Sequence, residues 1–419
     1  MEGGGRWTVF GVSSVVSLHT HPLVCTTPST NDEQADESQQ LCHNARWQGE
    51  MSTAVGEKRS ADAPADGQPD AKSMQKAEAR AAFMEVFAKL KAELLSEEPI
   101  VSQPEIARVW MERMMQYNVP WGKLNRGMAV KESLRAIEQS GQGTTADKAF
   151  QADVLGWCIE WLQAFFLVAD DMMDGSLTRR GQDCWYKVKD VGMVAINDCI
   201  LLEAHIYAIL KTHFRKEPYY LELLELFHEV TYQTSTGQML DLITAPIGTV
   251  DLSRYTMEAY MRIVTYKTAY YTFYLPVACA MHMAGIKDDA AFETTRSICL
   301  KMGQFFQIQD DYLDCYGDPE VIGKVGTDIE DNKCSWLVVQ ALIVATEEQK
   351  RVLENHYGKS DGESVAKVKQ LYRDLAIEGK YEDYEQRTYG ELVDEINKQK
   401  HLPKAVFEQL LAKIYKRQK

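Results

Sequence analysis

Apolar residues recur at helical spacing along most of the chain. Two stretches show the pattern at positions i, i+4, i+7 and i+11, which share one face of a helix: Phe83, Phe87, Leu90 and Leu94, and then Leu155, Ile159, Leu162 and Phe166. Thr346 followed by Gln349 is typical of a capping box at a helix start, and Gly358 predicts where that helix ends. Strand-like alternation and hairpin dipeptides are scarce. The pattern therefore predicts an all-α fold, a large single-domain bundle with one core.

The first 75 residues lack this periodicity. They are rich in Ser, Thr, Gln, Gly and Asp, a composition typical of disordered segments. We therefore divide the chain into a disordered N-terminal extension, residues 1–75, and a helical domain, residues 76–419. Residues 7–18 follow Arg6 and almost lack acids, which also allows a targeting leader. We expect a cytoplasmic protein, with a mitochondrial location as the alternative if this segment is a leader.

The charge balance excludes one class of protein and favours another. The 419 residues include 46 Lys and Arg against 61 Asp and Glu, a formal net charge of −15. Nucleic-acid binding needs a basic face for phosphate contacts, so we expect no nucleic-acid partner and favour a protein that gathers divalent cations. The nine cysteines are scattered without a CxxC pair, which indicates reduced thiols. No apolar run approaches the roughly 20 residues that cross a bilayer, so we expect no transmembrane segment.

Two aspartate clusters of the form DDxxD stand 140 residues apart: Asp170, Asp171 and Asp174, and then Asp310, Asp311 and Asp314. In each cluster the first and last carboxylates are four residues apart and share a helix face. Each follows an apolar stretch, so three like charges end a core-facing helix and need a cation to compensate them. Oxygen ligands select a hard ion, and Mg²⁺ suits carboxylates that share it with substrate phosphates. The alternative is that each cluster is a solvated helix end where acids occur by chance, which could explain one copy of the motif but not two. We therefore predict a Mg²⁺ site, with Mn²⁺ as a substitute.

Basic residues accompany the clusters. Arg179 and Arg180 follow the first cluster, where their guanidinium groups suit either phosphate oxygens or an ion-pair network with the aspartates. Lys123 and Arg126 stand three residues apart, so on a helical turn both reach one diphosphate, unless they are solvated. Further candidates stand in TSTGQMLD, YKTAYY and VIGKVGTDIEDNKCSW: Gln238, Asp241, Lys267, Thr268, Lys324, Asp328 and Lys333.

The two aspartate-rich regions resemble those of the farnesyl diphosphate synthases of eukaryotic type: LVADDMMDGSLTRRGQDCWY and FFQIQDDYLDCYGDPEVIGKVGTDIEDNKCSWLVVQ. Other blocks match the same family: YNVPWGKLNRG, TGQMLDLITAP, YKTAYYTFYLP and the basic tail IYKRQK. The resemblance covers about residues 76–419 and implies a bundle of the isoprenoid synthase type with a central cavity, acting as a homodimer. The family usually has Gly where this chain has Trp121. An indole beside Lys123 either crowds the neighbouring diphosphate pocket or lies on the surface.

The resemblance also implies a reaction and the residues for it. Isopentenyl diphosphate would be joined head to tail to dimethylallyl diphosphate and then to geranyl diphosphate, through Mg²⁺-assisted ionisation to an allylic carbocation. Asp170, Asp174 and Asp310 would bind the Mg²⁺ ions. Asp171, Asp311 and Asp314 would shape this metal cluster, directly or through waters. The residues that would bind the allylic diphosphate are Arg179, Lys267, Thr268, Gln307, Lys324 and Lys333. The catalytic groups among these are Lys267, Thr268, Gln307 and Arg179. The residues that would bind isopentenyl diphosphate are Lys123, Arg126, Gln163 and Arg180. Gln238, Asp241 and Asp328 would lie elsewhere in the site.

Product length is the last expectation from the resemblance, which places the floor for the growing chain at Phe165 and Phe166. These residues precede Asp170 by five and four positions, about 6 to 7.5 Å along a helix axis, where a ring would block the tail. An ordinary core role is the alternative for either ring. We expect farnesyl diphosphate as the product. The alternatives are a geranyl or geranylgeranyl diphosphate synthase of the same fold, and a non-catalytic helical paralogue, which would be expected to lose aspartates or arginines that are intact here.

Overall fold

The computed structural model describes residues 71–139, 143–246, 248–322 and 325–416. The targeting leader and nearly all of the predicted disordered extension lie outside the described residues. The first described helix, α2, begins at Ala71, five residues before the predicted domain boundary, so residues 71–75 are helical instead of disordered. The rest of that boundary assignment stays a prediction.

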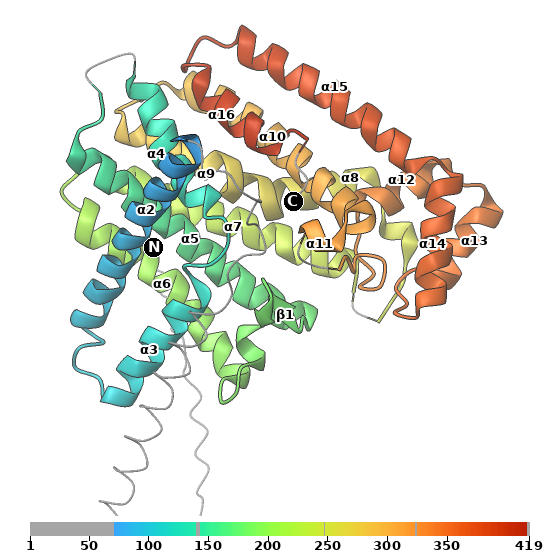
Figure 1. Cartoon of the computed structure of the whole chain (residues 1–419), viewed down its shortest axis with the longest axis horizontal. Helices are drawn as coiled ribbons and strands as arrows, with labels where there is room; N and C mark the ends of the chain where they lie inside the picture. Colours follow the sequence, from blue (N-terminus) through green and yellow to red (C-terminus); the bar gives the residue numbers. More distant parts are fainter. Residues whose placement is uncertain (1–70, 140–142, 247, 323–324, 417–419) are drawn as a thin grey trace, which may run out of the picture. The chain divides into compact units, whose positions relative to one another are not determined.

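Helices make up nearly all of the regular structure in the described residues, which confirms the all-α prediction (Figure 1). The N-terminal half contains α2 (Ala71–Ser96), α3 (Glu105–Asn118), α4 (Asn125–Glu138), α5 (Ala146–Asp174), β1 (Thr178–Arg179), β2 (Gln182–Asp183), η1 (Trp185–Lys187), η2 (Gly192–Val194), α6 (Ala195–Phe214) and α7 (Tyr220–Thr244). The C-terminal half contains η3 (Leu252–Arg254), α8 (Met257–Ile263), the π-helix η4 (Val264–Tyr274), α9 (Leu275–Met283), α10 (Asp289–Tyr316), α11 (Pro319–Ile322), α12 (Trp336–Val344), α13 (Glu347–His356), α14 (Gly362–Asp374), α15 (Ile377–Lys398) and α16 (Ala405–Ile414).

The predicted helix signals act as expected. Phe83, Phe87, Leu90 and Leu94 are all buried on the inner face of α2. At α13 both hydrogen bonds of the capping box form between Thr346 and Gln349. That helix ends at His356, and Gly358 takes the left-handed conformation with φ of 72°. Local sequence therefore defines where these helices begin, end and face.

The middle of the bundle consists of α5, α7, α10 and the continuous helix formed by η4 and α9. The π-helix η4 packs against α7 and α10, and α9 packs against α4, while α5 packs against α4 and α6. Helices α13 and α14 lie together at one end of the bundle, beyond α8 and α12 (Figure 1). Both aspartate clusters lie in the last two turns of central helices, the first in α5 and the second in α10. The packing thus brings two acidic helix ends into the interior.

Two helices are long and apolar enough to cross a membrane by length and composition alone, which the search for apolar runs missed. The 18-residue window in α5 is 78% buried, as expected for the core helix of a bundle. The window within Gly192–Phe214 is 44% buried and leaves apolar side chains exposed on α6. The expected lack of a transmembrane segment therefore stays a prediction.

Candidate active site

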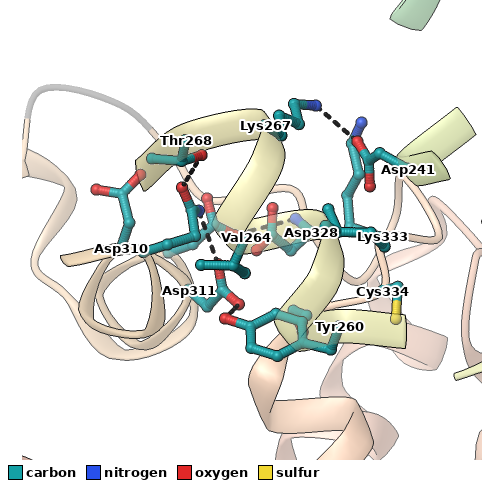
Figure 2. Close-up of a pocket in the computed structure, with 14 residues that line it drawn as sticks. Asp241, Tyr260, Val264, Lys267, Thr268, Asp310, Asp311, Asp328, Lys333 and Cys334 are labelled. Atoms are coloured by element: carbon teal, nitrogen blue, oxygen red, sulfur yellow. Dashed lines mark hydrogen bonds and ion pairs between the residues drawn. The ribbon is translucent and has the colours of Figure 1, made fainter. Parts of the chain in front are cut away.

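A cavity of about 140 Å³ lies beside the acidic end of α10 (Figure 2). Residues from α7, η4, α10 and the segment before α12 surround it. Its polar lining consists of Asp241, Lys267, Thr268, Gln307, Asp310, Asp311, Asp314, Asp328, Lys333 and Ser335. All of these except Ser335 were predicted as site residues, so the fold brings together residues that are far apart in sequence.

Two lysines connect the first aspartate cluster to this cavity. Lys267 Nζ donates to Asp170 Oδ1 at 3.2 Å and to Asp241 Oδ2 at 2.6 Å, the latter visible in Figure 2. Lys333 Nζ donates to Asp174 Oδ2 at 2.6 Å. Both lysines also line the cavity beside the second cluster, so they link the first cluster to the cavity that the second cluster lines.

The charged groups around the first cluster shift the pKa values of its aspartates. Burial disfavours the charged form of Asp170, but Lys267, Lys333 and Arg179 outweigh that effect and lower the pKa of Asp170. Burial and the neighbouring charge of Asp170 raise the pKa of Asp174. Carboxylates this close together need cations between them, and the lysines provide that charge from within the protein.

The donor chemistry of these helix ends fits a hard divalent cation. Within the described residues, no three His, Cys, Asp or Glu side chains stand close enough to hold an ion by themselves. Mg²⁺ is usually bound through one or two carboxylates and takes its other ligands from water and substrate phosphates. Asp170 and Asp174 at the end of α5, and Asp310 and Asp314 near the end of α10, supply carboxylate oxygens of this kind.

The middle aspartate of each cluster is bonded to protein groups. Asp171 Oδ1 accepts from Arg179 Nε at 2.8 Å and from Nη2 at 2.6 Å. Asp311 accepts from the hydroxyl of Tyr260 at 2.7 Å, from a backbone N–H at 2.8 Å and from Gln307 Nε2 at 3.0 Å. Burial raises the pKa of Asp311 to about 7 despite these donors. The contacts favour a supporting role for both residues, and their assignment as metal ligands stays a prediction.

Arg179 and Arg180 lie on a short hairpin that the sequence pattern did not predict. Strands β1 and β2 pair with Arg179 opposite Gln182, and the two turn residues, Arg180 and Gly181, have φ of 54° and 76°. A positive φ is uncommon for arginine, and such conformations concentrate at functional sites. The turn sends the two guanidinium groups apart: Arg179 contacts the first aspartate cluster, whereas Arg180 donates to the carbonyl of Trp121.

A second cavity, of about 430 Å³, adjoins the first because Asp310 lines both. All four residues predicted for isopentenyl diphosphate line it: Lys123, Arg126, Gln163 and Arg180. Arg126 Nε donates to Thr272 Oγ1 at 3.0 Å, and its guanidinium lies 4.9 Å from the centre of the Tyr271 ring. The predicted helical turn from Lys123 to Arg126 is wrong, because Leu124 has a φ of 54° and α4 begins only at Asn125.

Trp121 does not crowd this second cavity. Its indole Nε1 donates to the carbonyl of Gln116 at 2.9 Å, the side chain is 42% exposed, and Trp121 is not among the residues that line the cavity. The structure therefore favours the surface alternative.

We expect the substitution Trp121→Gly to change the KM for isopentenyl diphosphate by no more than about twofold, as for surface changes outside a site. Steady-state kinetics with varied isopentenyl diphosphate would check this. A KM that falls severalfold would show that the indole does restrict the pocket.

The remaining predicted residues divide into three groups. Phe165 and Phe166 are partly buried, with ring centres 4.7 Å apart, and Phe166 lies 5.9 Å from Tyr271. Gln238 Nε2 donates to Asp170 Oδ1 at 2.8 Å. Lys324 and the last three residues of the basic tail lie outside the described residues.

Besides Ser335, sequence reasoning missed other residues that line or contact the predicted site, among them Tyr260 and Glu160. Tyr260 bonds Asp311, and Glu160 lines the second cavity. A signal for Glu160 was present, because it is the lone acid in the apolar stretch LGWCIEWLQAFFLVA of α5. No comparable signal marks Tyr260.

Fold and site together define the class: an all-helical protein in which acidic helix ends and lysines adjoin an arginine-lined cavity, an arrangement suited to two diphosphate groups. The chain belongs to the polyprenyl synthetase family, whose model matches residues 108–375. It is 54% identical over 338 residues to farnesyl pyrophosphate synthase of Panax ginseng, covering 80% of this chain and 98% of that protein. It is 55% identical to farnesyl pyrophosphate synthase 2 of Cannabis sativa, with the same coverage. The solved structure of T. brucei farnesyl diphosphate synthase complexed with risedronate superposes with a TM-score of 0.74 at 35% identity, covering 81% of this chain and 100% of that one.

Proposed function

We propose that this chain is a prenyltransferase that makes farnesyl diphosphate from isopentenyl and dimethylallyl diphosphates, with geranyl diphosphate as the intermediate. The observation that carries the proposal is the pair of adjoining cavities: the second aspartate cluster and two lysines line one, and four basic side chains line the other, Lys123, Arg126, Arg180 and Lys413. Two diphosphates held side by side are what a condensation of this kind requires. Curated relatives named farnesyl pyrophosphate synthase, more than 50% identical over about four fifths of the chain, support this substrate class.

The first cavity would bind the allylic diphosphate. Arg179, Lys267 and Lys333 carry the positive charge that offsets the charge of the departing diphosphate. Bound Mg²⁺, or Mn²⁺ in its place, would be held by Asp170, Asp174 and Asp310 and would act as a Lewis acid on the leaving group. Thr268 Oγ1 donates to Gln307 Oε1 at 3.1 Å, so two neutral dipoles face the position of the allylic cation without placing a strong nucleophile there.

The second cavity would hold isopentenyl diphosphate. Lys123, Arg126 and Arg180 bind its diphosphate, and the amide of Gln163 adds a hydrogen bond. Fixing both reactants in adjoining cavities directs the double bond at the allylic cation, so that the new carbon–carbon bond forms once the allylic carbon–oxygen bond has broken. The proton lost at the end goes to the departing diphosphate.

Separate substitutions should distinguish the two cavities. Arg179→Ala removes the cation bonded to Asp170 and Asp171 and is expected to raise the KM for geranyl diphosphate about tenfold or more. Arg126→Ala removes a cation from the second cavity and is expected to raise the KM for isopentenyl diphosphate by a similar factor. Each KM is measured with the other substrate saturating. If both variants changed both KM values alike, the assignment of separate pockets would have to be dropped.

The test of the function uses the purified full-length protein, labelled isopentenyl diphosphate, dimethylallyl diphosphate and Mg²⁺. Label should enter a longer prenyl diphosphate only when both substrates are present. A correctly folded protein that incorporates no label would instead support the non-catalytic alternative.

We also propose that the chain forms a homodimer through α6 and α7. These neighbouring helices expose apolar side chains at helical spacing: Ile196 and Ile200 on α6, and Tyr232, Met239 and Ile243 on α7. An exposed apolar face on two packed helices is typical of a protein interface, and the family resemblance favours a second copy as the partner.

The double substitution Ile200→Asp and Met239→Asp is therefore expected to halve the mass measured by light scattering. Ile106→Asp, which changes an even more exposed apolar residue on α3, is the control and should leave the mass unchanged. A wild-type protein that is monomeric at micromolar concentration would contradict the dimer.

The cellular location is a proposal that rests on sequence alone. We place the activity in the cytoplasm, with the mitochondrion as the alternative if residues 7–18 act as a leader. Fluorescent fusions with and without residues 1–70 would separate the two.

A further inference from the structure

Glu160 is a buried carboxylate inside the cavity that the proposed function assigns to an anion. The side chain is 1% exposed and lines the cavity together with Arg126, Gln163 and Arg180. A carboxylate repels a diphosphate and is costly to bury. Its presence there requires a compensating role, which its contacts reveal.

The first contact fixes the start of α4. Glu160 Oε1 accepts from the backbone N–H of Gly127 at 2.8 Å. Gly127 is the third residue of α4, and the residue before the helix, Leu124, supplies no side-chain cap. Glu160 therefore caps α4 from a different helix, directly beside Arg126. The two helices pack backbone to backbone here, because a Cβ added at Gly127 would lie only 2.7 Å from the carbonyl oxygen of Gly156 on α5. This close packing holds the N–H of Gly127 within reach of Glu160.

The second contact fixes an amide. Gln163 Nε2 donates to Glu160 Oε2 at 3.2 Å. A carboxylate only accepts, so this bond determines which end of the Gln163 amide is nitrogen. The amide nitrogen has two hydrogens, and the second remains available for a phosphate oxygen.

The third effect is on charge. Arg126 and Arg180 line the same cavity, and like charges held together in the free protein repel each other. Burial raises the pKa of Glu160, and the charges of Arg126, Arg180 and Arg80 of α2 act against that rise. The carboxylate in turn favours the charged form of Arg180. Glu160 thus offsets the repulsion that would otherwise drive these side chains apart before the substrate binds.

We propose that Glu160 is a positioning residue for isopentenyl diphosphate, which holds the start of α4, the amide of Gln163 and two arginines in the arrangement that receives the diphosphate. The proposal rests on the proposed function. It predicts that losing the charge of Glu160 weakens the anion site, although removing a negative charge alone would strengthen it.

Glu160→Gln tests this, because the amide still accepts from Gly127 N–H but carries no charge. We expect the KM for isopentenyl diphosphate to rise about tenfold, while the KM for geranyl diphosphate and kcat stay within about threefold of wild type. The matched control is Asp153→Asn, which also neutralises a buried carboxylate of α5 that is paired with α4, at 2.5 Å from Lys131, but does not line the cavity. It should leave both KM values unchanged. Glu160→Asp, which keeps the charge but withdraws the oxygens from Gly127 and Gln163, should also raise the KM for isopentenyl diphosphate.

An unchanged or lower KM for isopentenyl diphosphate in Glu160→Gln, or in Glu160→Asp if the first variant does not fold, would overturn the proposal. Equal rises in both KM values would also overturn it, because they would indicate a general structural effect. Wild-type turnover in the same assay keeps this outcome separate from a failure of the proposed function, in which no variant and no wild type would react.

Discussion

Asp170→Ala is expected to lower kcat by roughly a thousandfold or more while the helical content stays unchanged. Asp170 is where hydrogen-bond donors and cations of the site converge: its carboxylate accepts from the neutral amide of Gln238 and from Lys267, and Arg179 lies 3.4 Å away. Alanine removes a carboxylate expected to bind Mg²⁺ and also releases Lys267 from one of its two acidic partners. Turnover numbers at saturating substrates, with circular dichroism on the same samples, would measure the effect.

Two comparisons make this result specific. Asp147→Ala removes an exposed carboxylate at the opposite end of α5 and should leave kcat near the wild-type value. Chelation of divalent cations should abolish wild-type turnover, and added Mg²⁺ should restore it. Near-normal activity in the chelator, or in Asp170→Ala, would refute the account of the two aspartate clusters as a metal clamp.

The second large effect concerns product length. Replacing Phe165 and Phe166 together by alanine is expected to shift the main product to twenty carbons or more. The two rings contact each other at a tilt on α5 about one turn before Asp170, and Phe166 lies beside Tyr271 of η4. A tail that starts from the diphosphate beside Asp170 and runs along α5 therefore meets these rings, and their removal opens space below.

Sizing the dephosphorylated products by chromatography would check this. The single variants serve as controls and show which ring forms the floor, since one of the two can be an ordinary core residue. A double variant that stays active and still makes only farnesyl diphosphate would place the floor elsewhere in the bundle.

Local pattern predicts what local forces determine. The stripe from Phe83 to Leu94 and the capping box at Thr346 depend on helix geometry within a few residues, and the structure confirms both. The aspartate clusters were recognisable because three carboxylates at the end of an apolar helix conflict with burial unless a cation compensates them. The link between them depends on Lys267 and Lys333, which bond the first cluster and line the cavity beside the second.

Other parts of the site depend on contacts between distant residues. Arg180 takes a positive φ in a turn that contains no Asn or Asp, and its guanidinium bonds to the carbonyl of Trp121, so periodicity alone did not reveal the hairpin. The predicted helical turn from Lys123 to Arg126 also does not form, because Leu124 takes a left-handed conformation that is rare for leucine. Glu160 acquires its role only because α4 crosses α5 closely at Gly127.

The most direct measurement of the central claim offers the protein one allylic primer at a time, of five, ten or fifteen carbons, with labelled isopentenyl diphosphate and Mg²⁺. We expect the five- and ten-carbon primers both to yield the fifteen-carbon diphosphate, and the fifteen-carbon primer to take up no label. A product that stops at ten carbons, or ready extension of the fifteen-carbon primer to twenty, would show instead a geranyl or geranylgeranyl diphosphate synthase built on the same bundle.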